Sequence, residues 1–200
     1  MSITIFILLV TVLVSLSALR NRELFFKLDF QPYLIDRNKE WYRFFSHAFI
    51  HADGFHLGIN MYVLYTFGNT VEANFQALYG QQVWVAYYLL LYVGGVLFSA
   101  LPGYMRNKEN YAYHGVGASG AVSAVVFSYI LMNPFSKLGI ILIPIGLPAF
   151  AFGILYLGYE VYMDRNRKSN IAHSAHYIGA IFGLVFTAAT KPSLILRFFD

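Results

Sequence analysis

The sequence predicts an all-α polytopic membrane protein, folded as a single domain over residues 1–200. The first observation behind this prediction is composition: 58% of the residues are hydrophobic and 12% are charged, whereas soluble domains are typically about half apolar and roughly a quarter charged. The second is distribution, because the apolar residues form blocks rather than the one-sided pattern of a helix on a soluble core. Apolar blocks of this kind are typical of helices that cross a bilayer.

Six apolar blocks predict six membrane-spanning helices. Several are shorter than the roughly 20 residues that a straight crossing requires, so we expect the helices to extend beyond them or the bilayer to thin. The fifth helix is expected to begin at Pro148, because proline suits the first turn of a helix. Leu138–Ile145 is then an apolar loop or a short strand at the membrane edge. The predicted spans are 3–19, 56–71, 83–101, 115–132, 148–163 and 171–190.

The long connection between the first two predicted spans, residues 20–55, interleaves aromatic and charged residues. Aromatic side chains with a polar tip favour the headgroup layer of a membrane. We therefore expect this first loop to be a structured interfacial element rather than a free linker.

Composition and motifs argue against several classes of function. The net charge of +4 is spread through the loops without a basic stripe, so no nucleic-acid partner is expected. The absence of cysteine excludes a disulfide, a thiol nucleophile and a thiolate metal site. His47, His51 and His56 are closely spaced, but the H-E-x-x-H pattern is missing and Asp53 is the only acid nearby. We expect no metal or other cofactor, and assign His47 and His51 to bonds with loop backbone.

Polar residues inside the predicted spans indicate a functional site, because ionisable groups at membrane depth are costly to bury. With six spans, the N-terminal ends of the second, fourth and sixth helices lie on one side of the membrane. His56 opens the second helix, Ser119 is expected about one turn into the fourth, and His176 about one and a half turns into the sixth. At 1.5 Å per residue, Ser119 and His176 would both lie roughly 6–8 Å below their helix starts, so topology brings the three residues to a similar depth.

Ser119 is the candidate nucleophile. A serine hydroxyl needs a neighbouring base to take its proton, and the flanking glycines leave the backbone uncovered for a substrate carbonyl. The hydrolase elbow G-x-S-x-G is not matched, and taken alone Ser119 is better interpreted as a small packing residue. Residues at helical spacing form a small-residue stripe suited to close helix packing: Gly117, Gly120, Ala121 and Ala124.

His176 is the candidate base, with His173 as its competitor and a structural histidine as the alternative. It heads a second stripe at helical spacing, formed with Gly179, Ala180 and Gly183. If this stripe packs on the stripe of the fourth helix, His176 reaches Ser119. Glu72 and Glu160 are the acids nearest to a span and lie towards helix ends, so we expect a two-residue Ser–His arrangement without a carboxylate.

His56 and Asn60 share one face of the second helix at i, i+4 spacing. An imidazole, a side-chain amide and the backbone N–H of Ser119 could together stabilise a developing oxyanion. The alternative is that Asn60 bridges two helices by hydrogen bonding.

Together these residues resemble the rhomboid family of intramembrane serine proteases over most of the chain. The matching elements occur in the family's order: Arg43-Phe44-Phe45-Ser46-His47-Ala48-Phe49-Ile50-His51, His56-x-x-x-Asn60, Gly117-Ala118-Ser119-Gly120 and Ala175-His176-x-x-Gly179-x-x-x-Gly183. The resemblance implies a six-helix rhomboid-like bundle, with Ser119 as nucleophile and His176 as base. It also implies an oxyanion hole of His56, Asn60 and the Ser119 amide, and a loop-stabilising role for Arg43.

The resemblance further implies that the substrates are transmembrane helices of other proteins, with membrane lipids as surroundings and the fifth helix as a lateral gate. Two departures stand out. Tyr42 replaces the tryptophan of the family's Trp-Arg pair, and Ser123 stands where some members carry an aromatic that stacks on the catalytic histidine. The alternatives are an inactive rhomboid-like protein that binds membrane clients and a small transporter. The sequence leaves substrate and oligomeric state open.

Localisation is expected in a membrane as a multi-pass protein, in the cytoplasmic membrane if the source is bacterial. Eleven of the 14 basic residues fall in loops on the active-site side, and Lys137, Lys191 and Arg197 on the other. The positive-inside rule would then put the active site on the cytoplasmic side. The resemblance implies the reverse, with the N-terminus inside, and we favour that orientation because the folded first loop holds six of the eleven.

Overall fold

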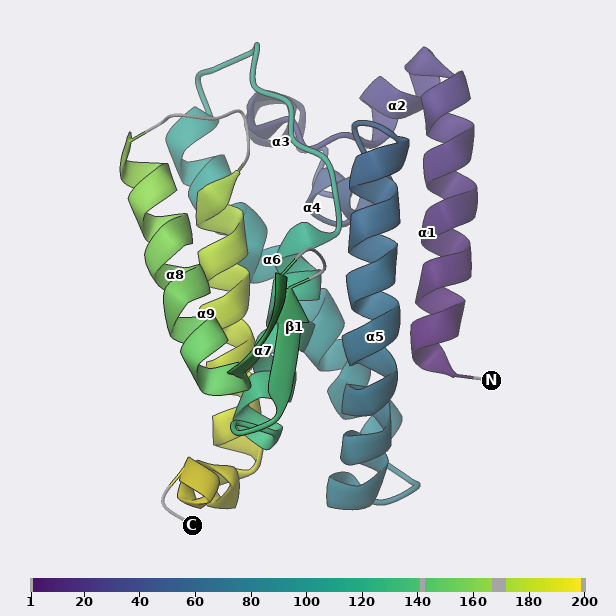
Figure 1. Ribbon diagram of the computed structural model, residues 1–200. Coiled ribbons are helices and arrows are strands. Elements are labelled where there is room, and N and C mark those ends of the chain that lie inside the picture. The colour runs from purple at the N-terminus through teal and green to yellow at the C-terminus, as the bar shows by residue number, and fades with distance from the viewer. Residues whose placement is uncertain (1, 141–142, 167–171, 199–200) are drawn as a thin grey trace.

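The computed structural model describes residues 2–140, 143–166 and 172–198 (Figure 1). It is a helical bundle with both termini at the end away from the short helices of the first loop. The long helices are α1 (Ile3–Arg20), α5 (Gly54–Tyr79), α6 (Trp84–Asn107), α7 (Ser119–Met132), α8 (Ala149–Asn166) and α9 (His173–Thr190). The shorter elements are α2 (Arg22–Leu28), α3 (Pro32–Asn38), α4 (Arg43–Ser46), η1 (His47–Phe49), β1 (Lys137–Ile140), β2 (Ile143–Pro148) and η2 (Pro192–Phe198).

Two of the described helices, α1 and α6, are long and apolar enough to cross a membrane by themselves. A third candidate arises if α9 and η2, which meet at an angle of 109°, are counted as one broken span. The fold is therefore mostly helical with apolar membrane-type helices, and the count of six spans stays a prediction.

The prediction that the fourth helix begins at Gly115 is wrong. Gly115 pairs with Phe30 in an isolated antiparallel bridge, and Gly117 has φ of +112°, a conformation that favours glycine and interrupts a helix. Helix α7 consequently begins at Ser119, so the nucleophile candidate is its first residue rather than one turn inside it.

Other boundaries also differ from the predicted ones. Pro148 ends strand β2 instead of opening the fifth helix. The described parts of the apolar stretch predicted as a loop or short strand belong to the antiparallel strands β1 and β2, in which Leu138 pairs with Leu147. Helices α5, α6 and α8 continue past their apolar blocks, because polar residues at helix ends also continue the backbone hydrogen bonds. The predicted start of the sixth span at residue 171 lies outside the described residues, and α9 begins at His173.

Helix α7 is the buried centre of the bundle, in contact with α5, α6 and α9. A Cβ at Gly179 would overlap the carbonyl oxygen of Gly120, and one at Gly183 would overlap that of Ala124. The backbones of α9 and α7 therefore touch, which is the close packing that the small-residue stripes predict.

Glu72 joins α1 to α5. Its carboxylate, on α5, accepts hydrogen bonds from Ser2 Oγ (2.8 Å) and from the backbone N–H of Ile3 (3.2 Å) and Thr4 (3.0 Å). These amides are at the N-terminus of α1, where backbone donors lack helical partners and negative charge is favoured. Glu72 is thus a buried carboxylate with a structural explanation.

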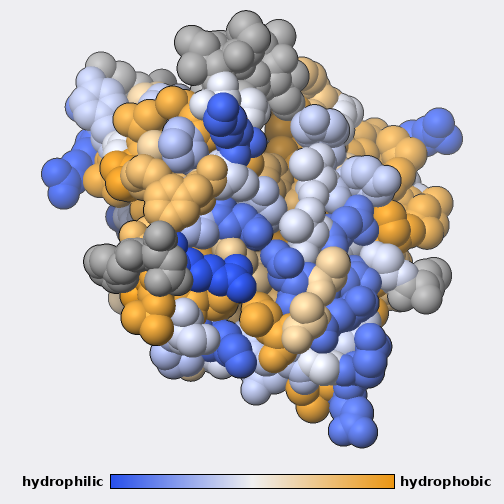
Figure 2. Space-filling model, turned by 60° about the horizontal axis from the view of Figure 1, so that its bottom comes forward, coloured by the Kyte–Doolittle hydropathy of each residue, from blue (hydrophilic) through white to orange (hydrophobic). Residues whose placement is uncertain are grey.

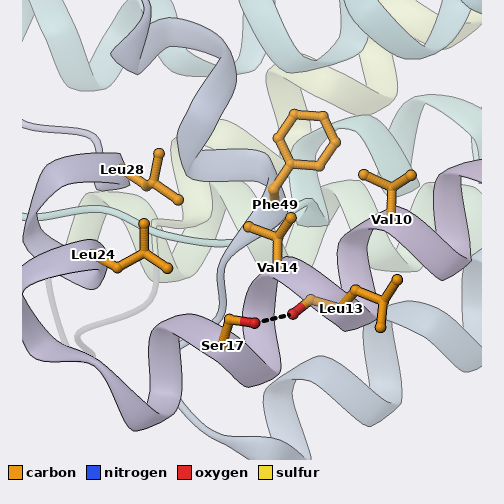
Figure 3. Close-up of a pocket in the computed structure, with 7 residues that line it drawn as sticks. All are labelled: Val10, Leu13, Val14, Ser17, Leu24, Leu28 and Phe49. Carbon is orange, nitrogen blue, oxygen red and sulfur yellow. Dashed lines mark hydrogen bonds between the residues drawn. The ribbon is translucent and has the colours of Figure 1, made fainter.

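The outer surface suits a lipid environment. Side chains of α1 and α8 that face outward include Leu13 (67% exposed) and Ile154 (67%), whereas the face in Figure 2 is hydrophilic over its middle and apolar along its flanks. An apolar groove of about 510 Å³ lies where α1 meets α2 and η1 (Figure 3). None of the described residues that line it has an ionisable side chain, and they are far from Ser119 in the sequence. It is lined by Val10, Leu13, Val14, Ser17, Leu24, Leu28 and Phe49.

Replacing Gly179 by leucine should lower the free energy of unfolding by about 1–3 kcal/mol or more, because the side chain would overlap the α7 backbone. The matched control is Gly158→Leu on α8, where an added Cβ meets nothing within 4 Å. Thermal unfolding in detergent should show a lower Tm for the first variant alone. Equal Tm values would contradict close packing of α9 on α7.

Candidate active site

Ser119 and His176 meet in the structure. Ser119 Oγ lies 2.8 Å from His176 Nε2, although the two residues are 57 positions apart. The His176 side chain is 17% exposed. This is the distance at which a serine hydroxyl can donate its proton to an imidazole nitrogen.

The helix positions differ from those expected, yet the pair still meets. Ser119 is the first residue of α7 and His176 the fourth of α9. The chain before Ser119 descends into the bundle as an extended segment, so α7 starts below the level at which α5 and α9 begin (Figure 1). This extended segment takes the place of the first turn of helix that the sequence predicts before Ser119, and it brings Ser119 to a similar depth.

The first loop holds this extended segment in place. Phe30 and Gly115 exchange two backbone hydrogen bonds, of 2.8 and 2.9 Å. Gly117 N–H donates to the carbonyl oxygen of His47 (3.0 Å), and Ala118 N–H donates to His51 Nε2 (3.4 Å). The His51 side chain thus bonds to backbone as predicted, as does the His47 side chain through Arg43. The contacts of His51 Nε2 and of the His47 carbonyl fix the residues directly before Ser119.

Arg43 is the centre of the first loop. The residue is 4% exposed, and its guanidinium donates to Asp29 Oδ1 (2.7 Å), to Glu40 Oε2 (2.6 Å) and to the backbone carbonyl of Phe26 (3.0 Å). The other oxygen of Asp29 lies 2.5 Å from His114 Nδ1, at the start of the extended segment. Through Asp29, these contacts connect Arg43 to the chain that leads to Ser119.

His47 lies beneath this network, outside the predicted spans. Burial lowers the pKa of His47 to about 4, so its ring is neutral at physiological pH. Nδ1 lies 2.9 Å from the carbonyl oxygen of Arg43, which requires that Nδ1 carry the proton. His47 therefore supports the loop.

His56 approaches the site through Gly117. A Cβ at Gly117 would lie 2.8 Å from His56 Cε1. Glycine is therefore required at this position for two reasons, the positive φ and the close approach of the His56 ring. Asn60, 5% exposed, donates from Nδ2 to the carbonyl oxygen of His56 at 3.0 Å, within its own helix. The structure brings His56 beside the residues preceding Ser119, and gives Asn60 an intrahelical bond rather than the interhelical one of the alternative reading.

Glu160 is the residue that the sequence argument missed. Its Oε1 lies 3.1 Å from His176 Nδ1, and its Oε2 lies 2.6 Å from His173 Nδ1. The side chain is 5% exposed. The expectation that no carboxylate reaches the histidine is therefore wrong.

The error has a physical reason. The sequence places Glu160 near a helix end and therefore predicts a position away from the site. However, α9 follows α8 directly in the chain, so the end of α8 lies on the same side of the bundle as the start of α9, which carries His176. Glu160 lies roughly 9 Å before the end of α8 and His176 roughly 4.5 Å after the start of α9, so both are within two turns of helix ends that follow one another in the chain. A charged residue within the last two turns of an apolar helix, just before a histidine-bearing one, was the signal available in the sequence.

Two further residues complete the surroundings. His173, the competing base, is 3% exposed and binds Glu160, and its ring centroid lies 6.2 Å from that of His176. Ser123, at the position where the resemblance puts an aromatic in some family members, has its Oγ 3.1 Å from the hydroxyl of Tyr156. Neither residue takes the position of Ser119 or His176.

Glu160, His173 and His176 form the cluster of possible metal donors among the described residues, with ligand atoms within 4.8 Å of one another. Two imidazoles and a carboxylate are a donor set that zinc also accepts. Here each carboxylate oxygen already accepts from one ring nitrogen, so hydrogen bonds account for the arrangement and we assign no metal to it.

Comparison with known proteins gives the family. The model described as Rhomboid domain matches residues 38–193. The chain belongs to the rhomboid family. Rhomboid proteins are integral to membranes, in agreement with the apolar helices described above.

Similar rhomboid proteins come from different compartments. RHOMBOID-like protein 12, mitochondrial, of Arabidopsis thaliana is 32% identical over 156 residues, covering 72% of this chain and 45% of that protein. Presenilin-associated rhomboid-like protein A, mitochondrial, of Danio rerio is 29% identical over 147 residues, covering 68% and 34%. Rhomboid protease GlpG of Haemophilus influenzae is 26% identical over 165 residues, covering 82% and 79%. The chain spans less than half the length of the first two relatives.

Replacing Arg43 by alanine should lower the free energy of unfolding by about 3–5 kcal/mol, because Asp29 would remain buried with its charge partly uncompensated. Arg37→Ala is the matched control, since Arg37 pairs with Glu109 at the exposed surface and its loss should leave Tm nearly unchanged. Thermal unfolding in detergent measures both. Similar Tm values for the two variants would contradict the central role of Arg43 in the loop.

Proposed function

We propose that this chain is an intramembrane serine endopeptidase that cleaves transmembrane segments of other membrane proteins. The observation that carries the proposal is the 2.8 Å contact between Ser119 Oγ and His176 Nε2 inside an apolar bundle. A protein that only binds membrane clients, or a small transporter, has no need of a hydroxyl paired with an imidazole in this way.

In the proposed reaction, Ser119 Oγ attacks the carbonyl carbon of the scissile peptide while His176 Nε2 takes its proton. His176 then gives that proton to the leaving amine, and the substrate acyl group stays on Ser119 as an ester. Water, deprotonated by the same nitrogen, attacks the ester and releases the carboxylate product together with free Ser119.

The start of α7 supplies the proposed oxyanion donors. Ser119 is the first helical residue, so its backbone N–H belongs to the amides without an intrahelical partner, and the positive end of the helix dipole lies there. His56 stands beside Gly117 and Asn60 one turn further along α5, where each would donate once substrate is bound. Gly117 leaves this backbone uncovered by a side chain, whereas Gly120 is buried against Ser99 and serves helix packing instead.

The wider architecture of the proposal follows the family. The six long helices α1, α5, α6, α7, α8 and α9 would be the six spans, with the first loop at the interface and the N-terminus inside. Helix α8 is the proposed gate for substrate, because its buried residues are few: Ala149, Gly153 and Glu160. Membrane lipids would surround the outward-facing leucines and aromatics.

Ser119→Ala should abolish cleavage while leaving the fold intact, because the change removes one hydroxyl and creates no large cavity. The assay uses purified protein in liposomes with a panel of model transmembrane substrates. Ser123→Ala is the matched control: it removes a hydroxyl one turn along the same helix that binds Tyr156 instead of His176. Cleavage that survives Ser119→Ala, or that is lost equally in both variants, would count against the proposed nucleophile.

A further inference from the structure

We propose that Glu160 is a positioning residue that fixes the tautomer and orientation of His176, so that the site operates as Ser119–His176–Glu160 rather than as a serine–histidine pair. This inference rests on the proposed function and deepens it. It departs from the expectation drawn from the sequence, which was a two-residue arrangement without a carboxylate.

The geometry defines which nitrogen carries the proton. A carboxylate can only accept, so its 3.1 Å contact with His176 Nδ1 requires a proton on Nδ1. The neutral ring then has a bare Nε2, and that is the nitrogen 2.8 Å from Ser119 Oγ. Glu160 therefore selects the tautomer in which His176 can act as a base.

His173 holds the carboxylate in turn. Its Nδ1 lies 2.6 Å from Glu160 Oε2, and both side chains are at most 5% exposed. One oxygen is thus engaged by each histidine, which prevents the carboxylate from turning away from His176. The four residues come from three helices: Ser119 from α7, Glu160 from α8, and both histidines from α9.

A purely structural role would not explain the choice of residue. A carboxylate buried in an apolar helix is costly, and neutral hydrogen-bonding groups could join α8 to α9 at lower cost. During turnover, however, His176 becomes positively charged, and a negative charge against Nδ1 stabilises that form where water is scarce. The buried charge is therefore best explained by the reaction that the ring performs.

The test compares three substitutions at Glu160, assayed for kcat and KM below their Tm. Glu160→Leu removes the acceptor for both histidines and should lower kcat by roughly 100-fold or more at similar KM. Glu160→Gln can accept from one ring while donating to the other, and should give an intermediate kcat. Glu160→Asp keeps a carboxylate and should restore most of the activity.

Glu72→Leu is the matched control, because Glu72 is also a buried carboxylate but binds the start of α1. It should lower Tm and leave kcat unchanged. If Glu160 served only to join α8 to α9, Glu160→Leu and Glu72→Leu would lower Tm to a similar extent and would have similar effects on kcat. Wild-type kcat in folded Glu160→Leu would overturn the proposal.

Nitrogen NMR of ¹⁵N-histidine protein gives a readout that needs no substrate and no folded variant at Glu160. Wild-type His176 should show a protonated Nδ1 and a bare Nε2, and the reverse tautomer would overturn the inference. If the wild type shows the expected tautomer yet cleaves none of the transmembrane substrates, the proposed function fails while the positioning by Glu160 stands.

Discussion

The contact between the backbones of α7 and α9 is the constraint on which the rest of the site depends. Gly179 and Gly183 allow α9 to lie directly against the carbonyl groups of Gly120 and Ala124. With side chains at these positions the helices would stand further apart, and a serine hydroxyl could no longer reach the imidazole of His176. Packing in the apolar interior thus sets the distance on which the proposed chemistry relies.

A second constraint is that polar groups buried in an apolar bundle need partners. Asp29 binds Arg43 and His114, Glu72 binds the first amides of α1, and Glu160 binds two histidines. The first two join elements of the scaffold. The third lies against the proposed base, and it belongs to the second half of α8, so a displacement of that segment would break the hydrogen bonds to His173 and His176.

The sequence was sufficient for the broad fold and for the pairing of Ser119 with His176, because helix topology and two small-residue stripes are both local patterns. It was insufficient where the chain leaves regular structure. The helix before Ser119 was extended to Gly115, since apolarity alone does not reveal that Gly117 adopts a positive φ or that Gly115 pairs with Phe30. These are contacts with the first loop, far away in sequence.

Glu160 shows the same limit in the site itself. The distance of Glu160 from the helix end follows from the sequence. The direction of its side chain depends on the rotation of α8 about its own axis relative to α9, and the hydrophobic pattern of the sequence does not determine that rotation. The count of six spans also stays a prediction, because α7 is short for a crossing and is buried by its neighbours instead of by lipid.

The central claim is that the fold makes Ser119 nucleophilic by placing it against His176. Reaction with a fluorophosphonate, followed by mass spectrometry of the modified peptide, tests this without a substrate helix. The account predicts an adduct on Ser119 in the wild type, and a large loss of labelling rate in a folded His176→Ala variant. A folded wild type that leaves Ser119 unmodified, or equal labelling rates with and without His176, would contradict it.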